Sequence, residues 1–329
     1  MFMKAIALFS GGLDSTLAAK VILEQGIDVV TLHCLTPFCT CDKKGCGVDT
    51  RDMAKQLGIE LKGAFLGEEY LSIVKNPKYG YGKNFNPCID CRILILRKAK
   101  EVMKEYGASF IITGEVLGQR PKSQHKDALN IIEQESGLAG LIVRPLSAKL
   151  LAPTIPEKEG WVKRDRLLDI CGRTRKPQIR LAHLFGIKNY PCAAGGCLLT
   201  DPAFCKRLKD LFDYGEFNLR EIELLKIGRH FRLNPSFKLI VGRDEKENKK
   251  LIQLVQRNDV IFRAKELAGP TGIGKGIVDE HSKILSAQII ARYAHPNGAV
   301  KISVKVAHEE QEVVCVERKD QKELERLRI

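Results

Sequence analysis

The chain has 329 residues, of which 44% are hydrophobic and 29% are charged, so it is long enough for two domains and has a soluble, globular composition. No apolar run reaches the roughly 18 residues that a membrane-spanning helix needs, and the N-terminus lacks a secretory signal pattern, so we expect a cytoplasmic protein with no membrane partner. The formal net charge of +14 favours a polyanionic partner such as nucleic acid, although plain solubility would account for the same surplus.

The first two thirds of the chain predict strands that alternate with helices. Short apolar runs predict strands at 4–9, 28–34, 60–66, 109–113 and 141–146, and apolar residues at helical spacing predict helices at 14–25, 49–57 and 88–106. This alternation is typical of a doubly wound parallel α/β sheet, which binds ligands at the carboxyl ends of its strands. We therefore expect the loops after the first, second and fourth strands to lie along one edge.

The pattern changes from about residue 216 onward. Strands are predicted at 237–241, 260–264, 299–306 and 312–317, and helices at 245–256 and 280–293, which together indicate a smaller α+β domain. We expect the domains to span residues 1–211 and 216–329.

Residues 10–16 read Ser-Gly-Gly-Leu-Asp-Ser-Thr and join the first strand to the first helix. Gly11 and Gly12 let the backbone lie against an oxygen-rich ligand, and the amides at a helix start favour phosphate. Asp14 would repel a phosphate unless a divalent cation bridged the two. The candidate nucleotide-binding residues are Ser10, Gly11, Gly12, Leu13, Asp14, Ser15, Thr16 and, in the loop after the fourth strand, Gly114. The alternative is a glycine turn that only closes a βα unit.

This segment lacks the Gly-Lys-Ser/Thr of a Walker A loop. It resembles the PP-loop of the ATP pyrophosphatases, which split ATP between its α and β phosphates and adenylate a substrate. The resemblance implies a HUP-like fold, ATP and Mg²⁺ as ligands, and a catalytic role for Asp14. Arg120, Lys149, Arg173 and Arg175 are candidates to stabilise the phosphates, or ordinary surface charges.

Eleven cysteines are many for a cytosolic chain, in which disulfides are disfavoured, so metal or sulfur chemistry is the better interpretation. Most of them fall into three groups, which are Cys34, Cys39, Cys41 and Cys46; Cys88 and Cys91; and Cys192, Cys197 and Cys205. A lone Cys-x-x-Cys, as at Cys88 and Cys91, is compatible with redox, zinc or iron–sulfur use. Three thiolates on a four-iron cluster would leave one iron open, whereas four would make a closed structural site.

Cys39, Cys41 and Cys46 form a second candidate metal site, for which Zn²⁺ is suited. Their loop follows the second strand, so they could instead join the sulfur chemistry, or form only a reduced cysteine-rich loop.

Four segments, at 86–92, 113–121, 144–149 and 194–200, resemble the PP-loop tRNA thiouridine synthases, and the resemblance covers about residues 3–210. It implies a [4Fe–4S] cluster on Cys88, Cys91 and Cys197, with Cys192 as the rival third ligand. Other members of that family use two cysteines without a cluster, one to carry a persulfide and one to resolve it. The expected catalytic residues are then Asp14, Cys197 and Cys192.

Residues 228–233 and 240–248 are similar to the NFACT-type RNA-binding domain, over about residues 224–317. Arg229, Arg232 and Arg243 are the candidate phosphate contacts. Residues 269–276 nearly match a Walker A loop, but Gly276 stands where a Ser or Thr should hold Mg²⁺, so we reject a second nucleotide site.

The resemblances together imply a tRNA sulfurtransferase that adenylates a uridine carbonyl oxygen and replaces it with sulfur, giving 2- or 4-thiouridine. Its expected partners are tRNA, a sulfur donor (sulfide, or a persulfide-bearing desulfurase or carrier protein) and a second copy in a homodimer. One alternative is a PP-loop ligase or amidotransferase acting on RNA or a small molecule, but no glutaminase signature is present. The other is a non-catalytic RNA-binding protein, which the intact motif at 10–16 argues against.

Overall fold

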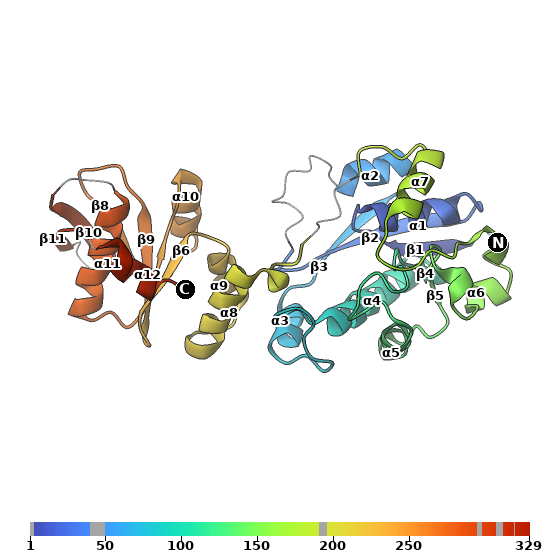
Figure 1. The fold of residues 1–329 in the computed structure, drawn as a ribbon, viewed down its shortest axis with the longest axis horizontal. Helices are drawn as coiled ribbons and strands as arrows, with labels where there is room; N and C mark the ends of the chain where they lie inside the picture. Colours follow the sequence, from blue (N-terminus) through green and yellow to red (C-terminus); the bar gives the residue numbers. More distant parts are fainter. Residues whose placement is uncertain (1–2, 40–49, 191–195, 295–297, 307–311, 319) are drawn as a thin grey trace. The chain divides into compact units, whose positions relative to one another are not determined.

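The structure is a computed structural model that describes residues 3–39, 50–190, 196–294, 298–306, 312–318 and 320–329. The chain divides into two compact units, Met1–Thr200 and Asp201–Ile329, each with its own sheet (Figure 1). We describe each unit by itself.

The first unit is built on a five-stranded sheet in which all strands are parallel. Its strands, in the order β3-β2-β1-β4-β5, are β3 (Leu61–Phe65), β2 (Asp28–Leu35), β1 (Lys4–Leu8), β4 (Phe110–Ile112) and β5 (Ile142–Val143). The chain starts in the middle strand, moves outward to β3 and then returns to the other side of β1. This order confirms the predicted doubly wound sheet, and its direction reverses between β1 and β4.

Helices cover both faces of this sheet, which is why β4 and most of β1 are apolar and buried (Figure 1). Alternate residues of β1 point to opposite faces: Ala5 and Ala7 pack with α1 and α2, whereas Ile6 and Leu8 pack with α4 and α5. The helices of this unit are α1 (Leu13–Leu23), α2 (Thr50–Leu57), α3 (Glu68–Lys75), α4 (Cys88–Glu105), α5 (Lys126–Ser136), α6 (Ile155–Lys158) and α7 (Lys176–Leu184), with short 3-10 turns at Ala148–Leu150, Arg164–Arg166 and Leu198–Thr200.

The second unit is built on a six-stranded antiparallel sheet. Its strands, in the order β11-β10-β8-β9-β7-β6, are β11 (Glu312–Val316), β10 (Val300–Val306), β8 (Val260–Ala264), β9 (Thr271–Gly276), β7 (Phe237–Val241) and β6 (Arg229–Asn234). Its helices are α8 (Pro202–Tyr214), α9 (Leu219–Leu225), α10 (Glu245–Gln253), α11 (Glu280–Tyr293) and α12 (Gln321–Leu327). The apolar side of α11 packs on one face of the sheet, and α9 and α10 pack on the other. This is the smaller α+β domain that the sequence predicts.

The division between the units falls after Thr200, before the predicted boundary at residues 211–216. The difference comes from α8, because its Asp210 makes ion pairs inside the second unit. The carboxylate of Asp210 accepts hydrogen bonds from Arg232 Nε at 2.9 Å and Lys238 Nζ at 2.8 Å. Both basic residues lie in strands of the second sheet, so α8 is held by that unit.

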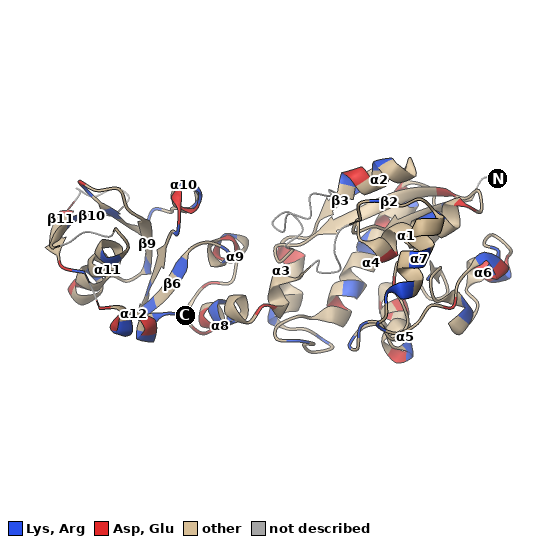
Figure 2. Ribbon diagram, turned by 45° about the horizontal axis from the view of Figure 1, so that its top comes forward, with Lys and Arg blue, Asp and Glu red and all other residues tan. Residues whose placement is uncertain are grey.

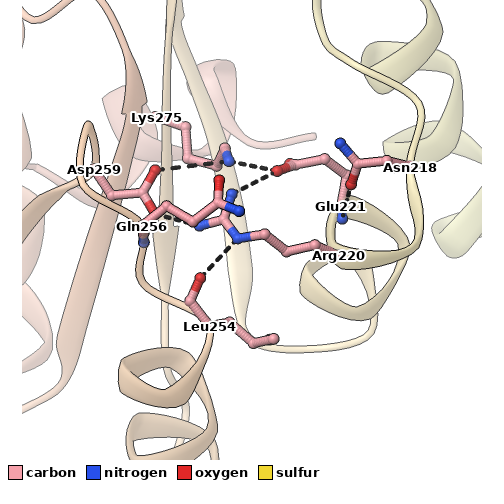
Figure 3. Close-up of polar contacts among 7 residues, drawn as sticks. All are labelled: Asn218, Arg220, Glu221, Leu254, Gln256, Asp259 and Lys275. Carbon is pink, nitrogen blue, oxygen red and sulfur yellow. Dashed lines mark hydrogen bonds and ion pairs between the residues drawn. The ribbon is translucent and has the colours of Figure 1, made fainter.

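A second polar network fastens α9 to the same sheet (Figure 3). Arg220 pairs with Glu221 at 2.8 Å and with the buried carboxylate of Asp259, and its Nε donates to the Leu254 carbonyl at 2.7 Å. Lys275 of β9 pairs with Glu221. Each buried carboxylate therefore faces a basic partner, which indicates that these ion pairs have a structural role in holding α9 on the sheet.

The near-match to a Walker A loop at 269–276 is largely strand β9, which confirms that it is no second nucleotide loop. Gly274 is required by packing, since a Cβ there would lie 2.3 Å from Phe237 Cζ.

Acidic and basic residues are interspersed on α10 and α12, whereas α7 carries basic residues and no acidic one (Figure 2). Within the described ranges, no helix combines the length and apolarity that crossing a membrane requires.

Candidate functional site: a phosphate loop beside a group of thiols

The turn between β1 and α1 can only be made with glycine at position 11. Gly11 has a φ of +70°, and a Cβ there would also lie 2.9 Å from Thr50 Oγ1 and 3.0 Å from Thr50 Cα. Gly12 caps α1 with no side-chain hydrogen bond, so no side chain covers the first amides of the helix from that position. The start of α1 therefore keeps the features of an anion-binding turn.

Hydroxyl groups brace this turn from inside. Ser15 Oγ donates to the Gly12 carbonyl at 2.9 Å, and Thr16 Oγ1 donates to the same carbonyl at 3.0 Å. Ser10 Oγ lies 3.2 Å from Ser15 Oγ. These bonds fix the backbone of the turn before any ligand is present.

Asp14 is the acidic residue of the turn, and one of its oxygens has no protein partner. Its Oδ2 accepts from Gln119 Nε2 at 3.2 Å and lies 3.3 Å from Arg175 Nη2. Its Oδ1 is buried and makes no hydrogen bond to any described residue. A buried carboxylate oxygen of this kind suits a hard divalent cation, so the residues present fit the implied Mg²⁺.

The loop after β4 touches the phosphate turn, as its place at the reversal of the strand order predicts. A Cβ on Gly114 would lie 2.6 Å from Ser15 N and 2.7 Å from Asp14 C. Only glycine allows the two loops to meet this closely.

Of the four basic candidates, two are placed near this turn. Arg175, which caps α7, reaches Asp14, and Arg120 lies within electrostatic reach of Asp14 and Cys88. The pKa of Arg120 is lowered, first because its guanidinium is partly withdrawn from water and then because Arg92 repels it. By contrast, Arg173 is exposed, and the exposed Lys149 donates to the Asp165 carbonyl at 2.9 Å.

A buried ion pair supports the loop after β4. Glu115, 2% exposed, accepts from Arg144 Nε at 3.0 Å and from Thr113 Oγ1 at 3.1 Å, and Arg92 lies 3.5 Å away. Burial alone would raise the pKa of Glu115, but the two guanidinium groups hold it below its ordinary value. Glu115 is therefore charged and fixed, and Gly114 is held beside it.

Five thiols share one neighbourhood, and we call them the thiol group: Cys34, Cys39, Cys88, Cys91 and Cys197. Cys34 lies at the end of β2, and Cys88 and Cys91 lie in the first turn of α4. Burial raises the pKa of Cys34 and of Cys197 to about 12, and nearby cysteines of the group raise both further. Cys34 and Cys197 are therefore protonated at neutral pH, and any metal that binds them must displace protons.

Tyr70 of α3 joins the thiol group as a hydrogen-bond donor. Its ring is 1% exposed, and its hydroxyl is hydrogen-bonded to the thiol of Cys91. Burial first, and then the neighbouring Cys91, raise the pKa of Tyr70 well above its ordinary value, so the hydroxyl keeps its proton. No motif marks Tyr70 or Thr50 in the sequence, because each reaches the site through packing, whereas Gln119 lies in the motif segment 113–121.

The sequence predicts an iron–sulfur site and a second metal site on the cysteines of this unit. Among the described residues, no three His, Cys, Asp or Glu side chains are placed to hold a metal ion. Cys41, Cys46 and Cys192 lie outside the described residues. Cys88, Cys91 and Cys197 influence one another electrostatically, and three soft thiols within such reach of one another suit an iron–sulfur cluster, which is larger than a single ion.

Two family models match the chain. Residues 2–149 match "Thiamine biosynthesis protein (ThiI)", and residues 228–328 match "NFACT protein RNA binding domain". The chain joins a ThiI-family PP-loop domain to an NFACT-type RNA-binding domain. Both predicted resemblances are confirmed, and the NFACT match extends past the predicted end at 317 to include α12.

Curated relatives match the ThiI-family domain. A probable tRNA sulfurtransferase of Thermococcus kodakarensis is 30% identical over 152 residues, which are 44% of this chain and 36% of the relative. A tRNA-specific 2-thiouridylase MnmA of Leptospira interrogans is 32% identical over 126 residues, 34% of this chain and 33% of the relative. The chain thus spans about a third of the length of the curated relatives it matches.

Among solved structures, a 4-thiouridine synthetase–RNA complex with bound ATP matches with a TM-score of 0.39 and 22% identity. The match covers 61% of this chain and 45% of that one.

Proposed function

We propose that the chain is an ATP-dependent tRNA sulfurtransferase, which adenylates a uridine carbonyl oxygen and replaces it with sulfur to give 2- or 4-thiouridine. The observation that carries this proposal is the neighbourhood of a phosphate turn and a thiol group, with Arg120 in reach of both. The names of the curated relatives of the ThiI-family domain support the same reaction.

The chemistry explains why both parts are needed. A uracil carbonyl oxygen is a poor leaving group, so attack of that oxygen on the α phosphate of ATP first turns it into an adenylate and releases pyrophosphate. Sulfur then adds to the carbon and AMP leaves. A protein that performs only the second step would have no use for the turn at Ser10–Thr16.

We assign the phosphate-binding role to the turn itself. The amides of residues 11–15 and the close approach of Gly114 hold the β and γ phosphates, and Asp14 holds Mg²⁺ through its unpaired Oδ1. Arg175 lies 3.3 Å from Asp14, so its guanidinium would stand beside the phosphates and offset their charge. Positioning and charge stabilisation then supply most of the rate acceleration.

We assign Cys88, Cys91 and Cys197 as ligands of a [4Fe–4S] cluster. When bound by three protein thiolates, such a cluster offers one open iron to a sulfur species. Around it, the Tyr70 hydroxyl orients Cys91, and Arg92 and Arg120 supply positive charge near Cys88. The sulfur donor in this proposal is sulfide or a persulfide-bearing protein.

We assign tRNA binding to the NFACT-type domain, with Arg229 as its main phosphate contact. Arg229 lies over the Tyr293 ring, 4.4 Å from its centre. The other two candidates are engaged within the protein: Arg232 makes two hydrogen bonds to Asp210, and Arg243 pairs with Glu247. A guanidinium held by a carboxylate has less charge to offer a phosphate.

The test uses the whole chain, purified without oxygen and given ATP, Mg²⁺, sulfide and tRNA that lacks thiouridine. We expect thiouridine and AMP to appear in equal amounts, measured by nucleoside mass spectrometry and chromatography. A parallel reaction receives ammonia or an amino acid in place of sulfide; if AMP and a nitrogen-containing product form there while sulfide gives no thiouridine, the protein is a ligase or amidotransferase. If neither AMP nor a modified base forms, the proposal is wrong.

A further inference from the structure

Two segments that are far apart in the sequence meet at the thiol group through a single antiparallel β-bridge. Cys39 lies opposite Cys197, and the Leu198 amide donates to the Phe38 carbonyl at 2.9 Å. This hydrogen bond is made by the residues beside the two cysteines. Cys39 and Cys197 therefore occupy the non-hydrogen-bonded type of antiparallel position.

That position brings two side chains as close as a sheet allows. In such pairs the Cα atoms are about 4.5 Å apart and both side chains stand on the same face. Disulfides join cysteines whose Cα atoms are about 4.4–6.8 Å apart. The backbone pairing thus gives the two cysteines a Cα separation of the kind that a disulfide spans.

Hydrogen-bond donors lie beside both sulfurs, in surroundings whose burial raises the pKa of Cys197 to about 12. The Thr36 amide donates to Cys39 Sγ at 3.3 Å, and Thr36 Oγ1 lies at the same distance. The Leu199 amide hydrogen-bonds to Cys197 Sγ. Phe38 and Leu199 are fully buried and anchor the two segments. Donors of this kind stabilise the thiolates that attack and leave during thiol–disulfide exchange.

We propose that Cys39 and Cys197 are a redox-active thiol pair that reacts with a low-molecular-mass disulfide. One protein thiolate attacks the small disulfide and releases one small thiol, and the second protein thiolate then displaces the other. The pair loses two protons and two electrons and gains one sulfur–sulfur bond, while the small disulfide is reduced to two thiols. A dithiol reductant reverses the reaction.

Forming the Cys39–Cys197 disulfide would also affect binding of the cluster, an inference that rests on the proposed function. Cys197 would no longer be free to bind iron, so the oxidised protein lacks one of the three ligands assigned to the cluster. Cys39 would then decide when Cys197 is available, although it is not itself an assigned ligand. The pair would protect the third ligand from irreversible oxidation while no cluster is bound.

The pair itself is tested on the whole, cluster-free chain, equilibrated with glutathione disulfide. Remaining thiols are blocked with N-ethylmaleimide, and non-reduced peptides are mapped by mass spectrometry. We expect a Cys39–Cys197 cross-link that a Cys34→Ser variant keeps and a Cys39→Ser variant loses. A map dominated by Cys88–Cys91 or Cys34–Cys91, or by glutathione adducts alone, would overturn the proposal.

The effect of the disulfide on cluster binding is tested by reconstituting the cluster and measuring the iron content of the protein. Pre-oxidised protein should take up several-fold less iron than reduced protein and recover after treatment with a dithiol reductant, whereas Cys39→Ser should load equally well either way. Equal loading of oxidised and reduced wild-type protein would refute the control of the cluster by Cys39. A protein that binds no iron in any state would refute the assigned cluster. The cross-link map would still show whether Cys39 and Cys197 form a disulfide.

Discussion

At the scale of single residues, Asp14 matters most for the proposed reaction, since it is the only acid in the phosphate turn at residues 10–16. Asp14→Asn should lower AMP formation by at least about 100-fold, because an amide oxygen is a poor Mg²⁺ ligand, while tRNA affinity stays within about two-fold. AMP release and filter binding measure the two effects. Asp127→Asn, an exposed acid in the same unit, is the matched control and should leave both unchanged. Unaltered turnover in Asp14→Asn would remove the metal role.

Tyr70 illustrates what a motif cannot reveal. Its hydroxyl donates to a sulfur on another helix, so Tyr70→Phe removes one hydrogen bond and keeps the packing of the ring. Because donors to ligand sulfurs raise the reduction potential of a cluster, we expect a more negative potential in Tyr70→Phe, measured by redox titration followed by electron paramagnetic resonance. Tyr81→Phe, whose hydroxyl instead bonds the Val74 carbonyl at 2.6 Å, is the control and should leave the potential unchanged. A potential identical in all three proteins would argue against Cys91 as a ligand.

His230 gives the second unit a pH dependence. Burial first, and then the nearby Lys238, lower its pKa well below the ordinary value, so the folded protein keeps this ring neutral. Below about pH 6.5 the unfolded chain binds a proton that the folded chain does not, and stability should fall by about 1.4 kcal/mol per pH unit. Urea unfolding between pH 7 and 5 measures this slope. His230→Gln should flatten the slope and the exposed His281→Gln should not; equal slopes in wild type and His230→Gln would contradict the assignment.

At the scale of elements, the sequence predicted strands well where apolar runs were continuous, as in β1 and β2. Strands β6 and β9 were missed, since β9 is rich in glycine and its residues resembled a loop. Those glycines are there to pack against Phe237 and Ile290, a tertiary requirement that leaves no local pattern. Helices α3, α5 and α7 were also missed; they are short, with 8, 11 and 9 residues, so each contains only two or three turns of the helical pattern.

The meeting of two loops at the reversal of the strand order is the element-scale feature that matters for catalysis. Gly114→Ala should push the loop after β4 away from Ser15, because the added Cβ would meet backbone atoms that cannot move independently. We expect a loss of AMP formation of at least about ten-fold with tRNA binding retained. Gly63→Ala is the control, since a Cβ there has nothing within 4 Å. Equal activity of the two variants would show that the loops need not touch.

At the scale of the whole molecule, a unit that matches the ThiI family model and a unit that matches the NFACT RNA-binding model are joined in one chain. The candidate phosphate contacts of the second unit lie in the segments that resemble the NFACT-type domain, and the structure separates them by their ion pairs. Sequence could not do this, because Asp210 and Glu247, the acids that engage Arg232 and Arg243, are recognisable as partners only once the chain is folded.

Arg229→Ala should weaken tRNA binding and lower the slope of log K against log salt by about 1, as expected for the loss of one phosphate contact. Arg243→Ala should have a smaller effect on both, because Glu247 already holds that guanidinium. Binding titrations at several salt concentrations measure both quantities. The reverse ranking would mean that the ion pair opens on binding and that Arg243 is the contact.

In the proposed reaction, a uridine carbonyl oxygen attacks the α phosphate of ATP and leaves with AMP. This reaction is tested most directly with tRNA whose uridine carbonyl oxygens carry ¹⁸O, incubated with the whole chain, ATP, Mg²⁺ and sulfide in unlabelled water. We expect the AMP formed to contain one ¹⁸O for each thiouridine made, as measured by mass spectrometry. Unlabelled AMP, formed while the tRNA keeps its ¹⁸O, would contradict the proposed reaction.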